Sequence, residues 1–427
     1  MKKNDTRLDE FRQLKKDIRG SEKHLLVGMD VAKDKHYAFF GTATGKTLYK
    51  QLIFDNNIKG FEKLLLQAEA IRVQHGLEKF VFGLEPTANY HKPLGEFLIR
   101  HGYTVVLVGS GAVKHNRELL DGRWDKHDSK CAANVADLIS QGKCLFYDYP
   151  AENVRDLRNL LSLKRRLKKQ DHSLRMRIRN QLVAQYFPEL DRHMHKSMVE
   201  NLAIIKWCLD PSGIAAKEYK DFFLMVTTRD RGAAQQRRLM AIWESAGSSI
   251  GCKVGEAAKY EAALLVDSLK HIRQLIAETD AKVKKACLQF PEYECLLSIP
   301  GFGPAVSAAT LGAISDPFRF KTAKQVLKMA GLDLSASRSG KNSDNVTPKL
   351  SKKGKSELRY FLYQAGLVAS NSNKHFSAYF TNKLRGRERE RGIKTKMRVK
   401  LAAKMLIIAW TLMKKKELFD PACLKVD

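Results

Sequence analysis

Four carboxylates occupy positions from which they could bind metal ions. Asp30 ends an apolar run (VGMD), Glu85 follows another (FGLEPT), and Asp125 and Asp128 stand three residues apart in WDKHD. A separation of three places two side chains near one face of a helix. Hard oxygen ligands suit Mg²⁺ or Mn²⁺, and two such ions can stabilise the attacking and leaving oxygens of a phosphoryl transfer. The four acids therefore predict a metal-dependent phosphoryl-transfer site.

Each of these acids, taken alone, is weak evidence for a site. Asp and Glu at strand ends are usually solvated caps, and the neighbouring acids Asp34, Asp121 and Asp137 could be mistaken for ligands. We expect Asp137 to lie on the surface, because it stands about two and a half helical turns beyond Asp128. A non-catalytic nucleic-acid-binding protein with surface carboxylates stays open at this point.

A serine-containing loop is the second candidate for chemistry. In Ser337-Arg338-Ser339-Gly340, a hydroxyl beside cations could attack a phosphodiester, because cations stabilise the charge that develops on the phosphoryl oxygens. Serine in a glycine-rich loop is more often a turn residue, so the residues alone leave both roles open. The basic residues that follow are Lys341, Lys349, Lys352, Lys353, Lys355 and Arg359.

The large excess of positive charge indicates a polyanionic partner. The 427 residues include 76 Lys and Arg against 46 Asp and Glu, which is a formal net charge of +30. Such an excess favours nucleic acid over extracellular carbohydrate or a small acidic metabolite. We expect a basic helix at Lys383–Lys400 that binds nucleic-acid backbone. The expected contacts are Arg338, Lys341, Lys352, Lys353, Arg359, Arg385, Arg387 and Lys396.

Alternating strands and helices must position the four carboxylates. Apolar runs separated by turn-length gaps predict strands, and apolar residues at helical spacing predict helices. The resulting pattern indicates a mixed sheet with helices on its faces. The expected strands are His24–Val31, His36–Ala43, Leu48–Phe54, Lys79–Leu84 and Tyr103–Val108, and the expected helices are Lys59–Val73, Tyr90–His101 and Asp128–Gln141.

Two long helices are expected in the middle of the chain. One covers the basic stretch Arg155–Arg179, with leucines at near-heptad spacing, and the other runs from about Glu256 to Leu288. They could form an antiparallel coiled-coil arm or a dimerisation element, or they could be ordinary helices of one bundle. The stretch between them, Phe187–Lys253, has helical patterns but no recognisable chemistry.

The last region begins near Pro291 and is mostly helical. Its IPGFG segment, Ile299–Gly303, resembles the hairpin of helix-hairpin-helix modules, where glycine amides contact phosphate. A tight connection between two helices would need the same small residues. Leu401–Met413 is too short to span a bilayer, so we expect a buried helix there.

Several signals point to the inside of a cell. The N-terminal stretch Met1–Lys23 is charged throughout, unlike a signal peptide. Seven cysteines without a CxxC pair suggest neither a disulfide framework nor a zinc site. We therefore expect a cytoplasmic protein with no membrane contact.

Motifs near both ends of the chain resemble the DEDD class of insertion-sequence transposases, the IS110 family, which is related to Piv-type DNA invertases. The N-terminal motifs are VGMDVAKDKH, LEPTANYHKPL and WDKHDSKCAANVADLI, and the C-terminal ones are LLSIPGFGPAVSAATLGAI, FKTAKQVLKMAGLDLSASRSG and LSKKGKSELRYFLYQA. The resemblance implies α/β plus α architecture. It implies an RNase H-like, RuvC-type domain at residues 1–148, a coiled-coil domain with an insertion at 149–290, and a helical transposase domain at 291–427.

The same resemblance implies a mechanism and partners. Asp30, Glu85, Asp125 and Asp128 would hold Mg²⁺ or Mn²⁺, and Ser339 would form a covalent phosphoserine link while donor and target DNA strands are exchanged. Family members often have Lys-Thr where Arg123-Trp124 stands here, but the Asp-x-x-Asp spacing is kept. Some members use a structured noncoding guide RNA, and they act as dimers that join into tetramers in the nucleoid of bacterial or archaeal cells.

Other activities remain open on the sequence. A metal-dependent RuvC-like nuclease or junction resolvase would use the acids without a covalent adduct, and a site-specific invertase would work without guide RNA. Ser335 and Ser337 lie four and two residues before Ser339 and are alternative nucleophiles.

Overall fold

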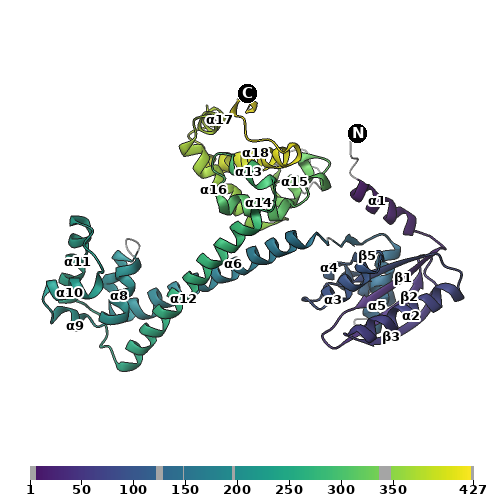
Figure 1. Cartoon of the computed structure of the whole chain (residues 1–427), viewed down its shortest axis with the longest axis horizontal. Coiled ribbons are helices and arrows are strands. Elements are labelled where there is room, and N and C mark those ends of the chain that lie inside the picture. Colours follow the sequence, from purple (N-terminus) through teal and green to yellow (C-terminus); the bar gives the residue numbers. More distant parts are fainter. Residues whose placement is uncertain (1–5, 122–127, 148, 195–197, 336–347, 425–427) are drawn as a thin grey trace, which may run out of the picture. The chain divides into compact units, whose positions relative to one another are not determined.

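The computed structural model describes residues 6–121, 128–147, 149–194, 198–335 and 348–424 (Figure 1). The chain divides into two compact units. Unit 1 comprises Met1–Ala151 with Phe318–Lys321, and unit 2 comprises Glu152–Pro317 with Thr322–Asp427. The expected division of unit 2 into a coiled-coil domain and a transposase domain stays a prediction.

Unit 1 is built on a mixed six-stranded sheet, as the alternating pattern predicted. Its strand order is β3-β2-β1-β4-β5-β6. β4 pairs in parallel with β1 and with β5, whereas β2 pairs antiparallel with β1 and β3, and β6 pairs antiparallel with β5. The strands are β1 (His24–Asp30), β2 (Lys35–Thr42), β3 (Thr47–Asp55), β4 (Lys79–Leu84), β5 (Val105–Leu107) and β6 (Leu145–Phe146).

Helices cover both faces of this sheet because the central strands are apolar on both sides. Leu25, Val27 and Met29 of β1 pack with α2 (Ile58–Gln74) and α3 (His91–Arg100). Leu26 and its neighbours pack on the other face. The helices of that face are α1 (Thr6–Ile18), α4 (Ser110–Asp121) and α5 (Asp128–Ser140). The two-residue β6, the charged α1 and the helix α4 were not among the expected elements.

Two long helices run antiparallel in unit 2, close to their expected bounds. They are α6 (Glu152–Arg177) and α12 (Glu256–Cys287), which lie side by side in Figure 1. Ion pairs join them in reverse order along the chain, which fixes their opposite directions: Lys164 to Asp280, Asp171 to Arg273 and Arg177 to Glu261.

The stretch between these helices forms a helical module with its own core. We call it the insert module, residues 187–253, and its helices are η2 (Pro188–His193), α8 (Met198–Cys208), α9 (Pro211–Ala215), α10 (Tyr219–Val226) and α11 (Ala233–Ala246). Phe187, Phe222 and Leu239 are fully buried there, together with Leu265 and Leu269 of α12. The apolar face of α12 therefore anchors the module.

The C-terminal part of unit 2 packs helices around α14. Every residue of α14 from Val306 to Ile314 is buried. α14 (Pro304–Ile314) is surrounded by α13 (Glu292–Leu297), α15 (Ala323–Ala330), α16 (Ser356–Ser372), α17 (Lys374–Leu384) and α18 (Ile393–Lys415). The expected buried helix at Leu401–Met413 lies within α18, and no helix among the described residues is long and apolar enough to cross a bilayer.

The IPGFG segment is a tight connection between α13 and α14. Gly301 has φ +87°, and a Cβ there would lie 2.5 Å from the carbonyl oxygen of Ala365 in α16. Ile299 and Phe302 on either side are buried. The close approach of two backbones explains the glycine without any phosphate contact.

The expected basic helix at Lys383–Lys400 is wrong. The stretch contains the end of α17, a turn, and the beginning of α18 at Ile393. Gly386 and Gly392 have φ of +78° and +73°, a conformation that only glycine adopts without strain. The turn separates the basic residues of this stretch into two groups.

Candidate functional site

Asp30 and Glu85 lie side by side at one edge of the sheet of unit 1. Met29 of β1 is in register with Leu84 of the parallel strand β4, so the residues that follow them are neighbours. The Glu85 N–H donates to the Met29 carbonyl at 3.4 Å, which carries the pairing one step beyond the strand. Both acids are partly exposed at the carboxyl ends of their strands.

The alternation of side chains along β1 and β4 predicts that the two carboxylates face the same side of the sheet, the side that α5 covers. A Cβ at Gly28 would lie 2.2 Å from the Ala132 carbonyl oxygen, and a Cβ at Gly83 would lie 2.0 Å from Cδ1 of Ile139. Both glycines therefore face α5. Side chains alternate along a strand, so Asp30 and Glu85, each two residues beyond its glycine, face the same side.

Gly28 and Gly83 also allow α5 to lie close to the sheet. The two glycines are directly paired in the β1–β4 register. Any side chain at Gly28 would collide with the backbone of α5, where the Ala136 nitrogen would be 2.5 Å away. The sequence contains a signal for this contact, since each glycine stands two residues before its acid.

The first residue of α5 is Asp128, one helical turn before Ala132. Because Ala132 lies against Gly28, the first turn of α5 covers the same face of the sheet, near the carboxyl ends of β1 and β4. The side chain of Asp128 and the whole of Asp125 lie outside the described residues. Among the residues that the structure describes, no cluster of three metal-binding side chains occurs.

A buried polar network fastens α5 to α4. The Asn116 amide donates to Asn134 Oδ1 and to Asp137 Oδ2, both at 2.6 Å, and Asn134 Nδ2 donates to the Val113 carbonyl at 2.6 Å. Asp137 also accepts from Gln141 at 2.8 Å. Asp137, which was expected on the surface, is partly buried and accepts hydrogen bonds from Asn116 and Gln141.

The segments on either side of the serine loop, residues 336–347, pair with each other in unit 2. β7 (Leu334–Ser335) pairs antiparallel with β8 (Lys349–Leu350), so Ser335 faces Lys349. The Ser351 N–H donates to the Asp333 carbonyl at 2.9 Å, which extends the ladder inward. The predicted residues Ser337, Arg338, Ser339 and Lys341 lie outside the described residues.

The predicted nucleic-acid contacts that the structure describes differ in their exposure and in their partners within the chain. Lys352, Lys353, Arg385 and Lys396 are exposed. Arg359 is partly buried and donates to the Ala330 carbonyl at 2.8 Å, so it supports the base of the serine loop.

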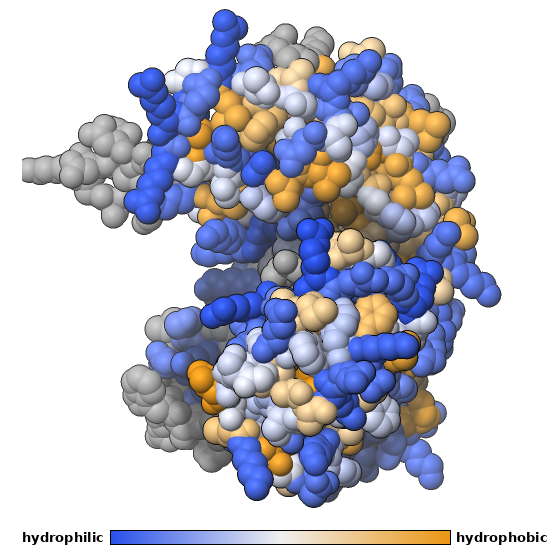
Figure 2. All heavy atoms as spheres, turned by 90° about the vertical axis from the view of Figure 1, so that its left-hand side faces the viewer, coloured by the Kyte–Doolittle hydropathy of each residue, from blue (hydrophilic) through white to orange (hydrophobic). Residues whose placement is uncertain are grey.

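Arg387 is exposed, but its guanidinium already has a partner within the chain. Its guanidinium forms a bidentate pair with Glu390 at 2.7 and 2.8 Å. On the face seen in Figure 2, hydrophilic side chains cover most of the surface, and hydrophobic ones gather in smaller groups between them.

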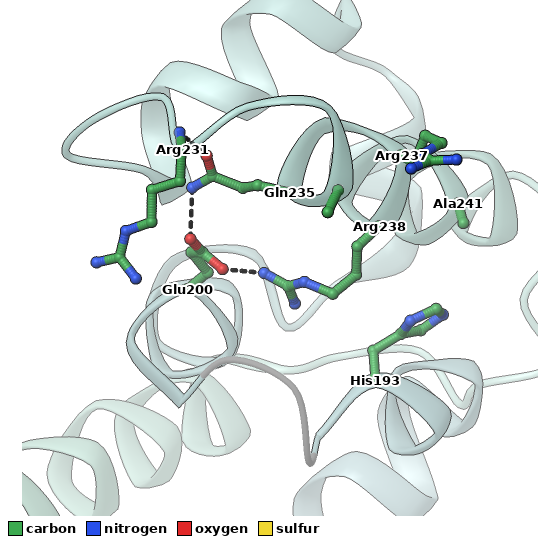
Figure 3. A pocket seen from close by; sticks show the side chains of 8 residues that line it. His193, Glu200, Arg231, Gln235, Arg237, Arg238 and Ala241 are labelled. Carbon is green, nitrogen blue, oxygen red and sulfur yellow. Dashed lines mark hydrogen bonds and ion pairs between the residues drawn. The ribbon is translucent and has the colours of Figure 1, made fainter.

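The insert module holds a polar cavity of about 600 Å³ that the sequence did not reveal. Arg231, Arg237 and Arg238 of its lining are close in the chain, but Glu200 and His193 come from other elements (Figure 3). The RDRG and QQRR segments were the available signal. Only the packing of η2, α8 and α11 brings these residues together.

Comparisons with known proteins place this arrangement in a family. Residues 27–188 match a family model described as a transposase of the DEDD IS110 type, and residues 293–381 match one described as the transposase IS116/IS110/IS902 family. An uncharacterised protein of insertion element IS116 from Streptomyces clavuligerus is 24% identical over 402 residues, which cover 93% of this chain and 96% of the relative. The chain therefore belongs to the IS110 family of insertion-sequence transposases.

Proposed function

We propose that this transposase cuts and exchanges DNA strands with two chemical centres. One is a carboxylate site of Asp30, Glu85, Asp125 and Asp128 in an RNase H-like, RuvC-type domain, and the other is the nucleophile Ser339. The observation that carries the proposal is the position of Asp30 and Glu85 at the carboxyl ends of the paired strands β1 and β4, whose glycines Gly28 and Gly83 lie against α5. Membership of a transposase family makes DNA the substrate.

The carboxylate site fits a divalent cation. Two partly exposed carboxylates face the same side at neighbouring strand ends, and the helix that begins at Asp128 crosses that face. Hard oxygen donors of this kind suit Mg²⁺ or Mn²⁺, which would stabilise negative charge on the oxygens of a phosphodiester. Asp30 and Glu85 would hold the cation, and Gly28 with Gly83 would keep α5 close enough for its first turn to contribute.

Ser339 would carry the covalent step. Its hydroxyl oxygen bonds to phosphorus, the bond from phosphorus to a sugar oxygen breaks, and the proton of the serine passes to that leaving oxygen. A sugar hydroxyl of the partner strand then attacks the phosphoserine and releases Ser339. The exposed Lys352 and Lys353 beside the loop would stabilise the charge that develops on the phosphate.

The remaining partners also follow from the family resemblance. We propose that the protein works as a dimer that assembles into a tetramer around donor and target DNA, in the nucleoid of the cytoplasm. A structured noncoding RNA would select the DNA sites. Sequencing of RNA that co-purifies with the protein tests this part, and one discrete species from the flank of its own gene is the expected result.

Trapping a protein–DNA adduct tests the serine chemistry. With Mg²⁺ and a nicked or suicide DNA substrate, we expect a covalent adduct in the wild type and in Ser335→Ala, and none in Ser339→Ala. Ser335 is the matched control because it lies in the β7–β8 ladder next to the same loop. Mg²⁺-dependent cleavage without any adduct would instead support a RuvC-like nuclease or junction resolvase.

A further inference from the structure

A buried histidine bonds the connection that follows Asp30. This connection, residues 31–34, joins β1 to β2. The Ala32 N–H donates to Nδ1 of His36, a residue of β2, at 3.2 Å. His36 is fully buried, whereas Ala32 is exposed. The proposed carboxylate and serine chemistry does not use this histidine.

A second residue bonds the same connection from the end of β3. Asn56 directly follows this strand. Its Nδ2 donates to the Lys33 carbonyl at 3.0 Å, and its backbone N–H donates to the Asp34 carbonyl at 2.9 Å. Together with the bond from Ala32, these contacts fix three of the four residues of the connection. We call His36 and Asn56 the loop clamp.

The loop clamp is itself fixed by its surroundings. The His36 ring packs edge-on against Phe54 of β3, with ring centroids 5.2 Å apart, and stacks on Phe61 of α2 at 6.2 Å. Asn56 stands directly before Asn57, whose side chain caps the start of α2. Both clamp residues are therefore held by regular elements, and groups supported in this way keep a precise position.

The burial of His36 costs stability that an apolar side chain would not cost. Burial is the largest cause that lowers the pKa of His36 below its ordinary value of 6.5, and the side chain of Asn56 acts in the opposite direction. The ring is therefore neutral at pH 7, with Nδ1 as the acceptor and the proton on Nε2. Among the described residues, Nε2 has no hydrogen-bond partner. A buried donor without a partner destabilises a fold, so what His36 contributes here is the acceptor for Ala32.

The loop clamp bonds the backbone next to Asp30 from the opposite face of the sheet. Asp30 is the last residue of β1 and is in register with Tyr37 of β2. Side chains alternate along a strand, so His36 faces the other side of the sheet from these two residues. Val31 is buried on that other side, in the core that contains Phe54. The clamp therefore restrains the chain behind Asp30 without occupying the side on which a cation would bind.

We propose that His36 and Asn56 are positioning residues for the carboxylate site, because they hold residues 31–34 and thereby keep Asp30 in the orientation that binds a divalent cation. The inference rests on the proposed role of Asp30, but neither clamp residue would touch the cation or the DNA. Loss of a group that orients a metal ligand typically weakens metal binding by about 10- to 100-fold.

Hydrogen–deuterium exchange of the metal-free, full-length protein and its binding of Mn²⁺ test the proposal together. His36→Leu removes the acceptor and keeps a side chain of similar size, whereas His36→Asn supplies a side-chain oxygen that can accept a hydrogen bond. His24→Leu is the matched control, since His24 is a buried histidine at the other end of β1 from Asp30. The electron paramagnetic resonance signal of free Mn²⁺ would measure binding, and urea unfolding would measure stability.

We expect His36→Leu to speed amide exchange in residues 31–34 by about tenfold or more and to weaken Mn²⁺ binding by about tenfold. Its free energy of unfolding should stay at or above the wild-type value, because the unpaired Nε2–H is gone. His36→Asn should recover both readouts, and His24→Leu should leave both unchanged. Asn56→Ala, which changes a partly exposed side chain, should act in the same direction as His36→Leu without disturbing the core.

The positioning role is overturned if His36→Leu and Asn56→Ala both bind Mn²⁺ like the wild type, or if His36→Asn recovers nothing. A loss of stability in His36→Leu with unchanged Mn²⁺ affinity would show a merely structural histidine. Asp30→Asn separates this inference from the proposed function, since it should lose most of the Mn²⁺ binding. If Asp30→Asn binds Mn²⁺ like the wild type, the carboxylate site fails and the positioning role fails with it. If Asp30→Asn loses binding but the clamp variants keep it, only the positioning role fails.

Discussion

At the scale of single residues, the proposed carboxylate site distinguishes between acids that lie close together in the sequence. Asp30 and Asp34 are four residues apart, but Asp30 ends β1 beside Glu85, whereas Asp34 lies exposed in the following turn. The two aspartates are chemically identical and nearly adjacent. Their different positions at the sheet edge make them a matched pair for a test of the carboxylate site.

We expect Asp30→Asn to abolish recombination between donor and target plasmids, with a loss on the order of 10³-fold or more, because it removes one charged oxygen donor from the site of phosphoryl transfer. Asp34→Asn should retain activity. A plasmid recombination assay measures both variants. Full activity of Asp30→Asn, or equal loss in both, would contradict the assignment.

A buried histidine makes the stability of unit 1 depend on pH. His24 begins β1, is 4% exposed and bonds Ser21 through Nδ1. Burial is the largest cause that lowers the pKa of His24 below its ordinary value of 6.5, and the nearby Lys79 adds to it. The unfolded chain therefore binds this proton at a higher pH than the folded chain does.

Stability should accordingly fall as the pH drops below about 6.5, until the lowered pKa of His24 is passed. Urea unfolding between pH 7.5 and 5.0 measures the slope. We expect His24→Gln to lose part of this pH dependence, whereas the exposed His75→Gln should keep it. The explanation fails if the His24 variant shows the full slope.

At the scale of elements, the contact between α5 and the paired glycines sets the geometry of the site. Gly28 meets the backbone of α5, which cannot move aside without shifting the whole helix. The hydrogen-bond network of Asn116, Asn134 and Asp137 joins α5 to α4. A methyl group at Gly28 would therefore disturb both the packing and the position of the first turn of α5.

We expect Gly28→Ala to reduce the free energy of unfolding by about 1–3 kcal/mol and to impair strand cleavage, because overpacking forces backbone shifts. Gly109→Ala is the control, since a Cβ at Gly109 would meet nothing within 4 Å. Chemical denaturation and the cleavage assay would report the two effects. Normal stability of Gly28→Ala would mean that α5 does not lie as close as the structure places it.

At the scale of the whole molecule, the surplus of positive charge is distributed over separate elements. Cations lie along α6, around the base of the serine loop, on both sides of the turn between α17 and α18, and at the rim of the insert-module cavity. Against the total of +30, the proposed carboxylate site would be a local concentration of acids. We propose that the charge serves to bind nucleic-acid backbone and that the acids and Ser339 carry the reaction.

Binding of duplex DNA should therefore depend strongly on salt. If the protein neutralises 6 to 10 phosphates, its affinity should fall by about 10³ to 10⁵ between 50 and 200 mM salt, because bound counterions are released. Fluorescence anisotropy of a labelled duplex at several salt concentrations measures this slope. An affinity that barely changes would exclude backbone charge as the main source of binding.

The sequence by itself determined most of the order of the elements, although it missed α1, α4 and β6. Apolar runs and helical spacing are local patterns, so the first five strands, the two long helices and the buried part of α18 could be predicted from them. The positions of Asp30 and Glu85 at strand ends followed from the same patterns. The match of several motifs to one family was also a property of the sequence alone.

Only the tertiary structure decided how distant parts of the chain meet. The pairing of Gly28 with Gly83, and with it the common face of Asp30 and Glu85, depends on strand register. The insert-module cavity joins Glu200 to residues more than thirty positions away, such as Gln235. Long-range packing leaves no periodic signal in the sequence, because each partner is chosen by shape and hydrogen bonding across space rather than along the chain.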